Sequence, residues 1–299
     1  MSEPTPEVDS APPPVVTGTP YEVARGVYVI PDGRVPLVPN IGLILGEERV
    51  LVVDTGMGPE SGRRVRAVAD QLRGARDLVL TITHFHPEHG FGASVFGDAT
   101  IVYNAAQRDE FHGKAPGYLE MFRTFGDNVA AALEGVELIG PTQVYDGDAY
   151  PLDLGERLVE LRTWGRAHTL SDQVVFLPEE RILFTGDLVE ESCFAIVPYF
   201  PPDDTDVDGG RWIAVLEQLE ALDPRIVVPG HGGIGGVSII RDAREYLTAL
   251  RSETRRLKAD GATVEAAVEE LDARMRSFHP DWLQPEWIGF GVRHFYDAG

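Results

Sequence analysis

Short apolar runs and longer segments with helical spacing alternate along this chain. The short runs are rich in valine, isoleucine and leucine and are bounded by glycine, proline or charged residues, which is typical of buried strands. They lie at Val27–Ile30, Ile41–Leu45, Val50–Val53, Leu78–Thr83, Thr100–Tyr103, Val174–Leu177, Ile182–Thr185 and Ile226–Val228. From about Glu60 to Leu72 the spacing is helical, with Val65, Val68 and Leu72 on one face. This alternation predicts an α/β protein whose sheets are covered by helices.

A second helical pattern lies within residues 104–148. Tyr118, Met121, Phe122 and Phe125 follow the spacing i, i+3, i+4 and i+7, so they share one face of a helix. This helix either docks on the body of the protein or forms a pocket wall or lid that meets an apolar substrate group. The two interpretations are compatible, because ligand pockets are lined mainly by such side chains.

The C-terminal part of the chain predicts two more amphipathic helices, Ile240–Leu250 and Val264–Met275, with Gly261 as the stop between them. Five large aromatic residues follow: Trp282, Trp287, Phe290, Phe295 and Tyr296. We expect this dense aromatic end to pack against the body or a second subunit. His279 and His294, which lie among these aromatic residues, are interpreted as structural.

The candidate chemistry is concentrated directly after the apolar run Leu78–Thr83. Residues 84–89 read His-Phe-His-Pro-Glu-His, so His84, His86, Glu88 and His89 are carried on one sharp turn. Imidazole nitrogen and carboxylate oxygen are good ligands for zinc and related divalent metals. Taken alone, the cluster could also be a surface patch that binds metals incidentally.

Three further candidate ligands each follow or end a separate strand-like segment. His168 lies in Gly-Arg-Ala-His-Thr-Leu-Ser-Asp, Asp187 ends Ile-Leu-Phe-Thr-Gly-Asp, and His231 follows Ile-Val-Val-Pro-Gly. Each of them singly would more often be a turn or cap residue. Together with the His cluster they indicate a metal centre.

The motifs resemble those of the metallo-β-lactamase superfamily of metallohydrolases, in the same order, over roughly residues 21–240. The resemblance implies a four-layer αββα sandwich and two metal sites, most often of zinc, with iron or manganese also possible. By this resemblance His84, His86 and His168 hold the first metal, Glu88, His89 and His231 hold the second, and Asp187 bridges them. Asp54, in Leu-Val-Val-Asp-Thr-Gly, corresponds to an early Asp that orients the ligand loop from outside the metal sphere.

Position 88 departs from the family pattern, because this chain has Glu where the family usually has Asp. The extra methylene moves the carboxylate by about one bond length, whereas ligand distances tolerate errors of only about 0.2 Å. Glu88 could ligate after a loop adjustment, act mainly as a proton shuttle, or leave the second site weak. The number of bound metals is therefore open.

We predict a metal-dependent hydrolase in which a metal-bound hydroxide attacks the substrate, with Glu88 and Asp187 orienting it and moving protons. A small-molecule ester, lactone or thioester is the expected substrate. Two alternatives stay open: a mononuclear iron sulfur dioxygenase, which uses this fold with one metal held by two His and one Asp, and a non-catalytic ligand-binding relative.

The composition of the chain argues against nucleic-acid and membrane partners. The formal net charge is −22, and no Lys/Arg-rich stretch is long enough to follow a nucleic-acid backbone, so we expect no nucleic-acid partner. No apolar stretch is long enough to span a membrane and the N-terminus lacks the pattern of a signal peptide, which favours a cytoplasmic protein. A homo-oligomer is possible.

Two other features are interpreted as structural. Cys193 is the only cysteine, which excludes an internal disulfide, and a buried small side chain is the favoured interpretation over a metal ligand. Asp204-Thr-Asp206-Val-Asp208-Gly resembles the start of a calcium-binding EF-hand loop, but Val215 occupies the position of the required bidentate Glu. Asp208 is instead predicted to cap a helix.

The predicted domain organisation has three parts. Residues 1–18 are rich in proline and acidic residues and are expected to be a disordered tail. Residues 19–240 form the metallo-β-lactamase-like catalytic domain, and residues 241–299 are a helical and aromatic extension packed on the same domain.

Overall fold

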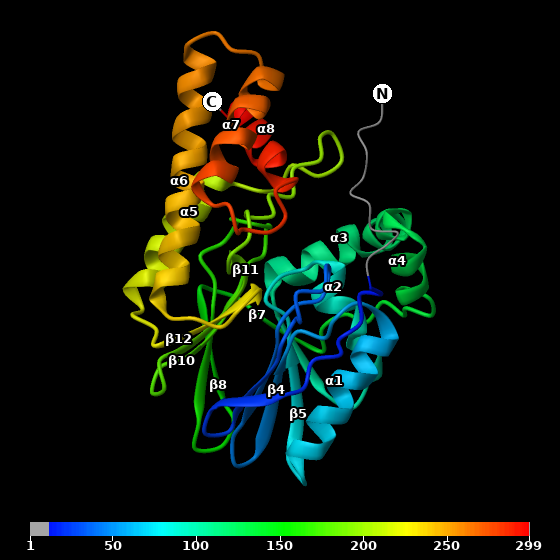
Figure 1. Ribbon diagram of the computed structural model, residues 1–299. Helices are drawn as coiled ribbons and strands as arrows, with labels where there is room; N and C mark the ends of the chain where they lie inside the picture. The colour runs from blue at the N-terminus through cyan, green and yellow to red at the C-terminus, as the bar shows by residue number, and fades with distance from the viewer. Residues whose placement is uncertain (1–11, 299) are drawn as a thin grey trace. The chain divides into compact units, whose positions relative to one another are not determined.

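The computed structural model describes residues 12–298, which form two compact units. The first unit contains the chain up to Thr163 together with Gln173–Glu180, and the second contains Trp164–Asp172 together with the chain from Arg181 (Figure 1). Within residues 12–298 there are two β-sheets, one of seven strands and one of five. The α/β class predicted from the alternation of apolar patterns is confirmed.

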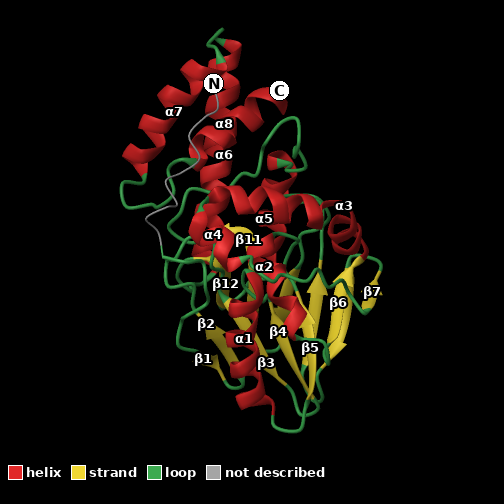
Figure 2. Cartoon of the chain, turned by 90° about the vertical axis from the view of Figure 1, so that its right-hand side faces the viewer, coloured by secondary structure: helices red, strands yellow, loops and turns green. Residues whose placement is uncertain are grey.

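The seven-stranded sheet belongs to the first unit, with strand order β1-β2-β3-β4-β5-β6-β7 (Figure 2). Its strands are β1 (Tyr21–Ala24), β2 (Val27–Ile30), β3 (Ile41–Leu45), β4 (Arg49–Val53), β5 (Asp77–Thr81), β6 (Thr100–Asn104) and β7 (Gln143–Tyr145). Neighbouring strands are antiparallel from β1 to β4 and parallel from β4 to β7. The carboxyl ends of β4 to β7 consequently meet at one edge of the sheet.

The helices of the first unit cover this sheet and complete its core. They are α1 (Gly58–Arg73), α2 (Pro87–Gly90), α3 (Ala105–Phe122) and α4 (Asp127–Ala132), with short 3₁₀ helices at Phe91–Val95 and Arg123–Phe125. Helix α1 contains the predicted Glu60–Leu72 segment and buries Val65 and Ala69. It has a proline in its first turn and is followed by Gly74, whose φ of 59° lies in the left-handed region that glycine adopts at low cost.

The aromatic face predicted between residues 104 and 148 lies on α3 and the turn that follows it. Tyr118 and Phe122 are each 7% exposed and belong to the hydrophobic core of the first unit, whereas Met121 and Phe125 are partly buried against that core. The interpretation of a helix that docks on the body is therefore confirmed for Tyr118 and Phe122.

The ordered chain begins earlier than the position near Tyr21 that the sequence pattern indicates. Residues 1–11 of the predicted tail lie outside the described residues, but Val15 and Val16 are buried. The backbone N–H of Val16 donates to Ser61 Oγ at 3.2 Å. Burial of these two valines favours attachment of this segment, because each buried side chain contributes roughly 1.5–3 kcal/mol.

Three further strands of the first unit are antiparallel: β8 (Ala149–Asp153), β9 (Leu158–Arg162) and β10 (Val174–Leu177). The second unit contributes the parallel pair β11 (Ile182–Glu190) and β12 (Ile226–His231). Every residue of β11 is buried, as expected for a strand that is covered on both faces.

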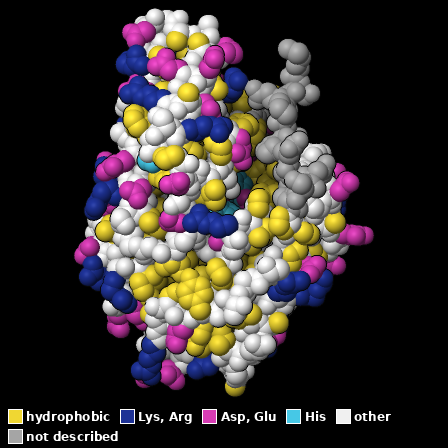
Figure 3. All heavy atoms as spheres, in the orientation of Figure 1, with side chains coloured by type: hydrophobic (Ala, Val, Ile, Leu, Met, Phe, Trp, Pro, Cys, Tyr) yellow, Lys and Arg dark blue, Asp and Glu magenta, His cyan; other side chains and the backbone are white. Residues whose placement is uncertain are grey.

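The helices of the second unit are α5 (Gly209–Ala221), α6 (Val237–Ala259), α7 (Val264–Phe278) and α8 (Trp287–Ala298). Helix α6 packs on β11 and β12 and contacts the other three helices (Figure 1). The exposed surfaces of α6 and α7 carry acidic and basic side chains in close succession (Figure 3), including the ion pair Arg274–Glu253 at 2.8 Å. No helix among residues 12–298 is both long and apolar enough to span a membrane.

Several local predictions for this unit are confirmed. The carboxylate of Asp208 accepts the N–H of Arg211 at 2.9 Å and caps α5. Gly261, with φ of 86°, follows the end of α6, where the prediction places the stop. Cys193 is buried, with 4% of its surface exposed.

His294 has the structural role predicted for it. It is buried in α8, and its Nε2 accepts the N–H of Gly209 at 2.9 Å, so the ring is neutral in the folded protein. Burial lowers the pKa of His294 below the ordinary value of 6.5. Above pH 6.5 the neutral ring is favoured in both states, and below it the unfolded chain binds the proton more readily than the folded chain does.

We therefore expect the free energy of unfolding contributed by His294 to fall as the pH drops through about 6.5 towards the lower pKa of the folded state. Urea unfolding of the wild type and of His294→Gln between pH 5 and pH 8 measures this contribution. The advantage of the wild type over the variant should shrink on acidification. An advantage that stays constant across this range would contradict the assignment.

Candidate metal centre

The seven predicted ligands fall into two groups, one in each unit. His84, His86, Glu88 and His89 lie in the first unit, and His168, Asp187 and His231 lie in the second. Every one of them is buried, with exposed fractions between 0% and 7%. Buried imidazoles and carboxylates are costly unless they are paired or bind a metal, so this concentration indicates a functional site.

The first group is positioned by the parallel half of the seven-stranded sheet. Asp54 directly follows β4, and residues 84–89 are separated from the end of β5 by two residues. Because β4 and β5 are parallel neighbours, their carboxyl ends present Asp54 and the His cluster at the same edge. Strand β5 ends at Thr81, two residues before the predicted Thr83, because the N–H of Thr83 donates to Asp54 rather than to a strand.

Asp54 organises this loop through three contacts. Its Oδ1 accepts the N–H of Thr83 at 2.7 Å, and its Oδ2 accepts the Thr83 hydroxyl at 2.9 Å and lies 2.9 Å from His89 Nδ1. A proton on His89 Nδ1 donates to this carboxylate and places the lone pair on Nε2, the atom that would ligate a metal. The backbone of Asp54 has φ of 66°, a conformation that residues other than glycine rarely adopt and that is concentrated at functional sites.

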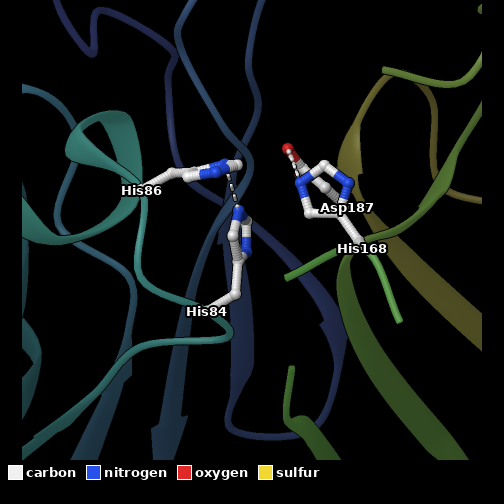
Figure 4. A group of neighbouring side chains, drawn as sticks. All are labelled: His84, His86, His168 and Asp187. Atoms are coloured by element: carbon white, nitrogen blue, oxygen red, sulfur yellow. Dashed lines mark hydrogen bonds and ion pairs between the residues drawn. The ribbon is translucent and has the colours of Figure 1, made fainter. Parts of the chain in front are cut away.

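His84 and His86 point their ring nitrogens at each other. His84 Nε2 and His86 Nδ1 are 3.1 Å apart, and the two rings meet edge to face (Figure 4). Two nitrogens bound to one tetrahedral zinc at about 2.0–2.1 Å would be roughly 3.3 Å apart. The spacing of this pair therefore fits a shared metal ion.

Glu88 and His89 belong to the short helix α2. The helix begins at Pro87, directly after His86, because proline at the first helical position is already restrained to helical φ. The N–H of His89 donates to the His86 carbonyl at 3.1 Å, which closes the turn. The turn and the helix that follows it thus carry three imidazoles and a carboxylate on six consecutive residues.

In the second unit Asp187 lies between two imidazoles. Its Oδ2 is 3.9 Å from His168 Nε2 (Figure 4) and 3.6 Å from His231 Nε2. The register between β11 and β12 shifts on both sides of Gly186, and such irregularities commonly redirect side chains at active sites. A carboxylate oxygen at nearly equal distance from two imidazoles suits a ligand shared between two metals.

Gly230, in Pro-Gly-His, allows this arrangement. A Cβ atom at this position would lie 1.9 Å from Asp187 Oδ1 and 2.7 Å from the carbonyl carbon of Gly186. Only a residue without a side chain lets β12 approach Asp187 so closely.

Trp212 of α5 supports the same group and was not found from the sequence. Its indole N–H donates to the Leu188 carbonyl at 3.0 Å, and its ring meets the His168 ring edge to face with centroids 5.1 Å apart. Trp212 is 1% exposed. The apolar spacing of Trp212, Val215, Leu216 and Leu219 indicates a buried tryptophan, but nothing in that spacing indicates that it contacts His168.

Asp54→Ala is expected to lower metal affinity by about 10- to 100-fold, because partners that orient metal ligands from outside the metal sphere contribute about that much. Isothermal titration of the metal-stripped chain with Zn²⁺ measures the change. Asp70→Ala, on the exposed face of α1, is the matched control, and it should bind zinc as the wild type does. Equal affinities for Asp54→Ala and the wild type would argue against this role of Asp54.

Comparison with known proteins agrees with these motifs. Residues 34–231 match the family described as the metallo-beta-lactamase superfamily. An acyl-coenzyme A thioesterase, MBLAC2 of Homo sapiens, is 27% identical over 227 residues, covering 70% of this chain and 78% of the relative. A metallo-beta-lactamase type 2 of Bacteroides fragilis is 24% identical over 227 residues, covering 73% and 79% respectively.

A solved structure of DIM-1 metallo-beta-lactamase superposes with a TM-score of 0.61 at 16% identity, covering 81% of this chain and 99% of the other. The chain belongs to the metallo-β-lactamase superfamily and has its fold, with C-terminal helices in addition. The prediction of a metal-dependent hydrolase of this superfamily is confirmed at the level of class.

Proposed function

We propose that this protein is a dinuclear zinc hydrolase of small-molecule acyl thioesters. The observation that carries the proposal is the ligand set itself: five buried imidazoles and two buried carboxylates in a chain of this superfamily. As the superfamily's motifs imply, His84, His86 and His168 would hold one metal, Glu88, His89 and His231 would hold the second, and Asp187 would be shared by both.

The donor chemistry favours zinc. Five nitrogen and two oxygen ligands match the preference of zinc for His and Asp/Glu, whereas calcium and magnesium prefer all-oxygen sites. Two bound cations would supply Lewis acidity and lower the pKa of water towards neutrality. Asp187 would hold the two sites in register, and Glu88 would move a proton towards the leaving group.

The thioester substrate is proposed from the relatives. Acyl-coenzyme A thioesterase from Homo sapiens shares 27% identity with this chain over 227 residues. All seven candidate ligands lie within the family-matched segment 34–231. A thiolate is a good leaving group at neutral pH because its conjugate acid has a pKa of only about 8.5. A weak proton donor therefore suffices, which is the role proposed for Glu88.

The function is tested by two measurements on one preparation. Elemental analysis of protein purified without chelator should find two zinc ions per chain, and a panel of acyl-coenzyme A thioesters, lactones and aryl esters should show the highest kcat/KM for a thioester. One iron per chain with oxygen uptake on a persulfide would instead establish the sulfur dioxygenase. Removal of the metal should abolish hydrolysis, and added zinc should restore it.

Glu88→Asp tests the departure from the family pattern. If Glu88 ligates the second metal, the shorter carboxylate should change the zinc affinity of one site by roughly tenfold and leave the other unchanged, because ligand distances tolerate only about 0.2 Å. Competitive zinc titration with a chromophoric chelator separates the two sites. If the wild type binds zinc but is inactive on the whole panel, while Glu88→Asp hydrolyses a member of it, the non-catalytic relative is the correct interpretation.

A further inference from the structure

Two buried amide side chains, those of Gln107 and Gln173, bind the chain segment that directly precedes the His cluster. Neither residue is among the predicted metal ligands. Gln107 and Gln173 are each 0% exposed, and both belong to the first unit. Their hydrogen bonds described below join them to the end of β5 or to β6 and β7 of the same unit. A buried amide is kept only where its donors and acceptors are satisfied, so its partners show what it holds in place.

Gln173 is bonded to the three residues that precede His84. Its backbone N–H donates to the Thr83 carbonyl at 2.7 Å, and its Nε2 donates to the Ile82 carbonyl and to Thr81 Oγ1, both at 2.9 Å. The Thr81 hydroxyl donates its own proton to the Val102 carbonyl at 2.7 Å, so towards Gln173 it can only be an acceptor. One residue thus fixes the end of β5 at three successive positions.

The orientation of the Gln173 amide is set by Tyr145. The Tyr145 hydroxyl donates to Gln173 Oε1 at 2.5 Å, which turns Nε2 towards β5. Tyr145 is 5% exposed, and burial raises its pKa well above the ordinary value of 10, so its hydroxyl keeps the proton it donates.

Gln107 reaches the same carbonyl groups from helix α3. It forms a capping box with Asn104: Gln107 N–H donates to Asn104 Oδ1 at 2.8 Å, and Asn104 N–H donates to Gln107 Oε1 at 3.0 Å. With Oε1 used in the cap, Nε2 donates to the Ile82 carbonyl at 2.9 Å and to the Thr83 carbonyl at 3.3 Å. The start of α3 and the start of the His cluster are therefore joined through one side chain.

Gln173 directly follows the turn formed by residues 168–172, which starts at the candidate ligand His168. Within that turn Asp172 accepts the N–H of Thr169 at 2.9 Å and its hydroxyl at 3.0 Å. The chain leaves this closed turn at Asp172 and is bound to Thr83 at the next residue.

We propose that Gln173, oriented by Tyr145 and assisted by Gln107, is a positioning residue that sets the backbone from which His84 and His86 present their nitrogens. The consequence for metal affinity rests on the proposed function, whereas the consequence for the loop backbone does not. Loss of a hydrogen bond to a buried carbonyl leaves that group without a partner and favours local opening.

The test compares Gln173→Met, Tyr145→Phe and the control Gln143→Met. Methionine matches the length of glutamine without its hydrogen bonds. Gln143 is the control because it lies on β7, two residues from Tyr145, and donates its side-chain amide to the Tyr150 hydroxyl at 2.5 Å rather than to the end of β5. Hydrogen exchange of the metal-free chain is followed for peptides that span residues 82–90 and, as an internal reference, residues 41–53.

Gln173→Met should speed exchange in residues 82–90 by about tenfold or more, and Tyr145→Phe by a smaller factor, with the reference peptides and Gln143→Met unchanged. The double variant should show less than the product of the two single effects, because both act on one amide. Cobalt-substituted Gln173→Met should show a shifted visible spectrum and a 10- to 100-fold weaker metal affinity.

Exchange in residues 82–90 that equals the wild type in both variants would overturn the proposal. If Gln173→Met does not fold, Tyr145→Phe, which removes one hydroxyl, decides the matter by the same exchange measurement. A wild type that binds neither zinc nor cobalt would refute the proposed function instead, and the exchange of the metal-free chain would still decide the role of Gln173.

Discussion

His86→Ala is expected to abolish metal binding at one site and to lower kcat/KM by on the order of a thousandfold, about 4 kcal/mol. The reason is that His86 Nδ1 lies 3.1 Å from His84 Nε2, and removal of one imidazole leaves the other without the second nitrogen of the pair. Zinc content by elemental analysis and thioester hydrolysis on the same preparation measure both effects.

His112→Ala is the matched control for this prediction. His112 is exposed on α3 and belongs to neither ligand group, so its removal should leave zinc content and turnover nearly intact. Melting temperatures of the metal-free forms show whether either variant changes the fold itself. If His86→Ala kept both its zinc and its turnover, the assignment of the His cluster would be wrong.

Gly230→Ala is the second large effect we expect, and it tests the site through the backbone alone. The added Cβ would lie 1.9 Å from Asp187 Oδ1 and 2.9 Å from the backbone nitrogen of Asp187, so either Asp187 or strand β12 must move. We expect a loss of at least about a hundredfold in kcat/KM, and overpacking should lower the free energy of unfolding by roughly 1–3 kcal/mol.

Gly289→Ala provides the comparison. It adds the same methyl group inside α8, where the nearest atom would be Val268 Cγ1 at an ordinary contact distance of 3.5 Å. This variant should keep wild-type activity and gain a little stability, since alanine favours a helix more than glycine does. Wild-type kinetics for Gly230→Ala would show that Asp187 does not need its present position.

Local structure was largely predictable from the amino-acid pattern. The strands Val27–Ile30, Ile41–Leu45 and Val174–Leu177 were predicted with the bounds that the structure has, because four or five consecutive apolar residues between turn signals admit few other conformations. The Asp208 cap was predictable for a similar reason, since it depends on residues within three positions along the chain.

The candidate ligands were also recognisable, because metal chemistry restricts the side chains that can serve and most of them follow or end a strand. Asp187 differs from the prediction, because β11 continues past it to Glu190. Asp54 was identified with them, but its three contacts with Thr83 and His89 were not. Those contacts depend on the parallel register of β4 and β5, which no local signal encodes. For the same reason the Asn104–Gln107 pair could be interpreted as a helix cap, but its link to the Thr83 carbonyl could not.

The sequence by itself thus determined the α/β class, the strands that carry the candidate ligands and the type of metal chemistry, since these follow from composition and short-range periodicity. The tertiary structure decided which residues hold those ligands in place. Gln173 lies more than eighty residues after β5, yet it bonds to three successive residues at the end of that strand. Hydrogen bonds between distant segments arise only when the whole sheet forms, and their partners cannot be inferred from the neighbours of each residue in the chain.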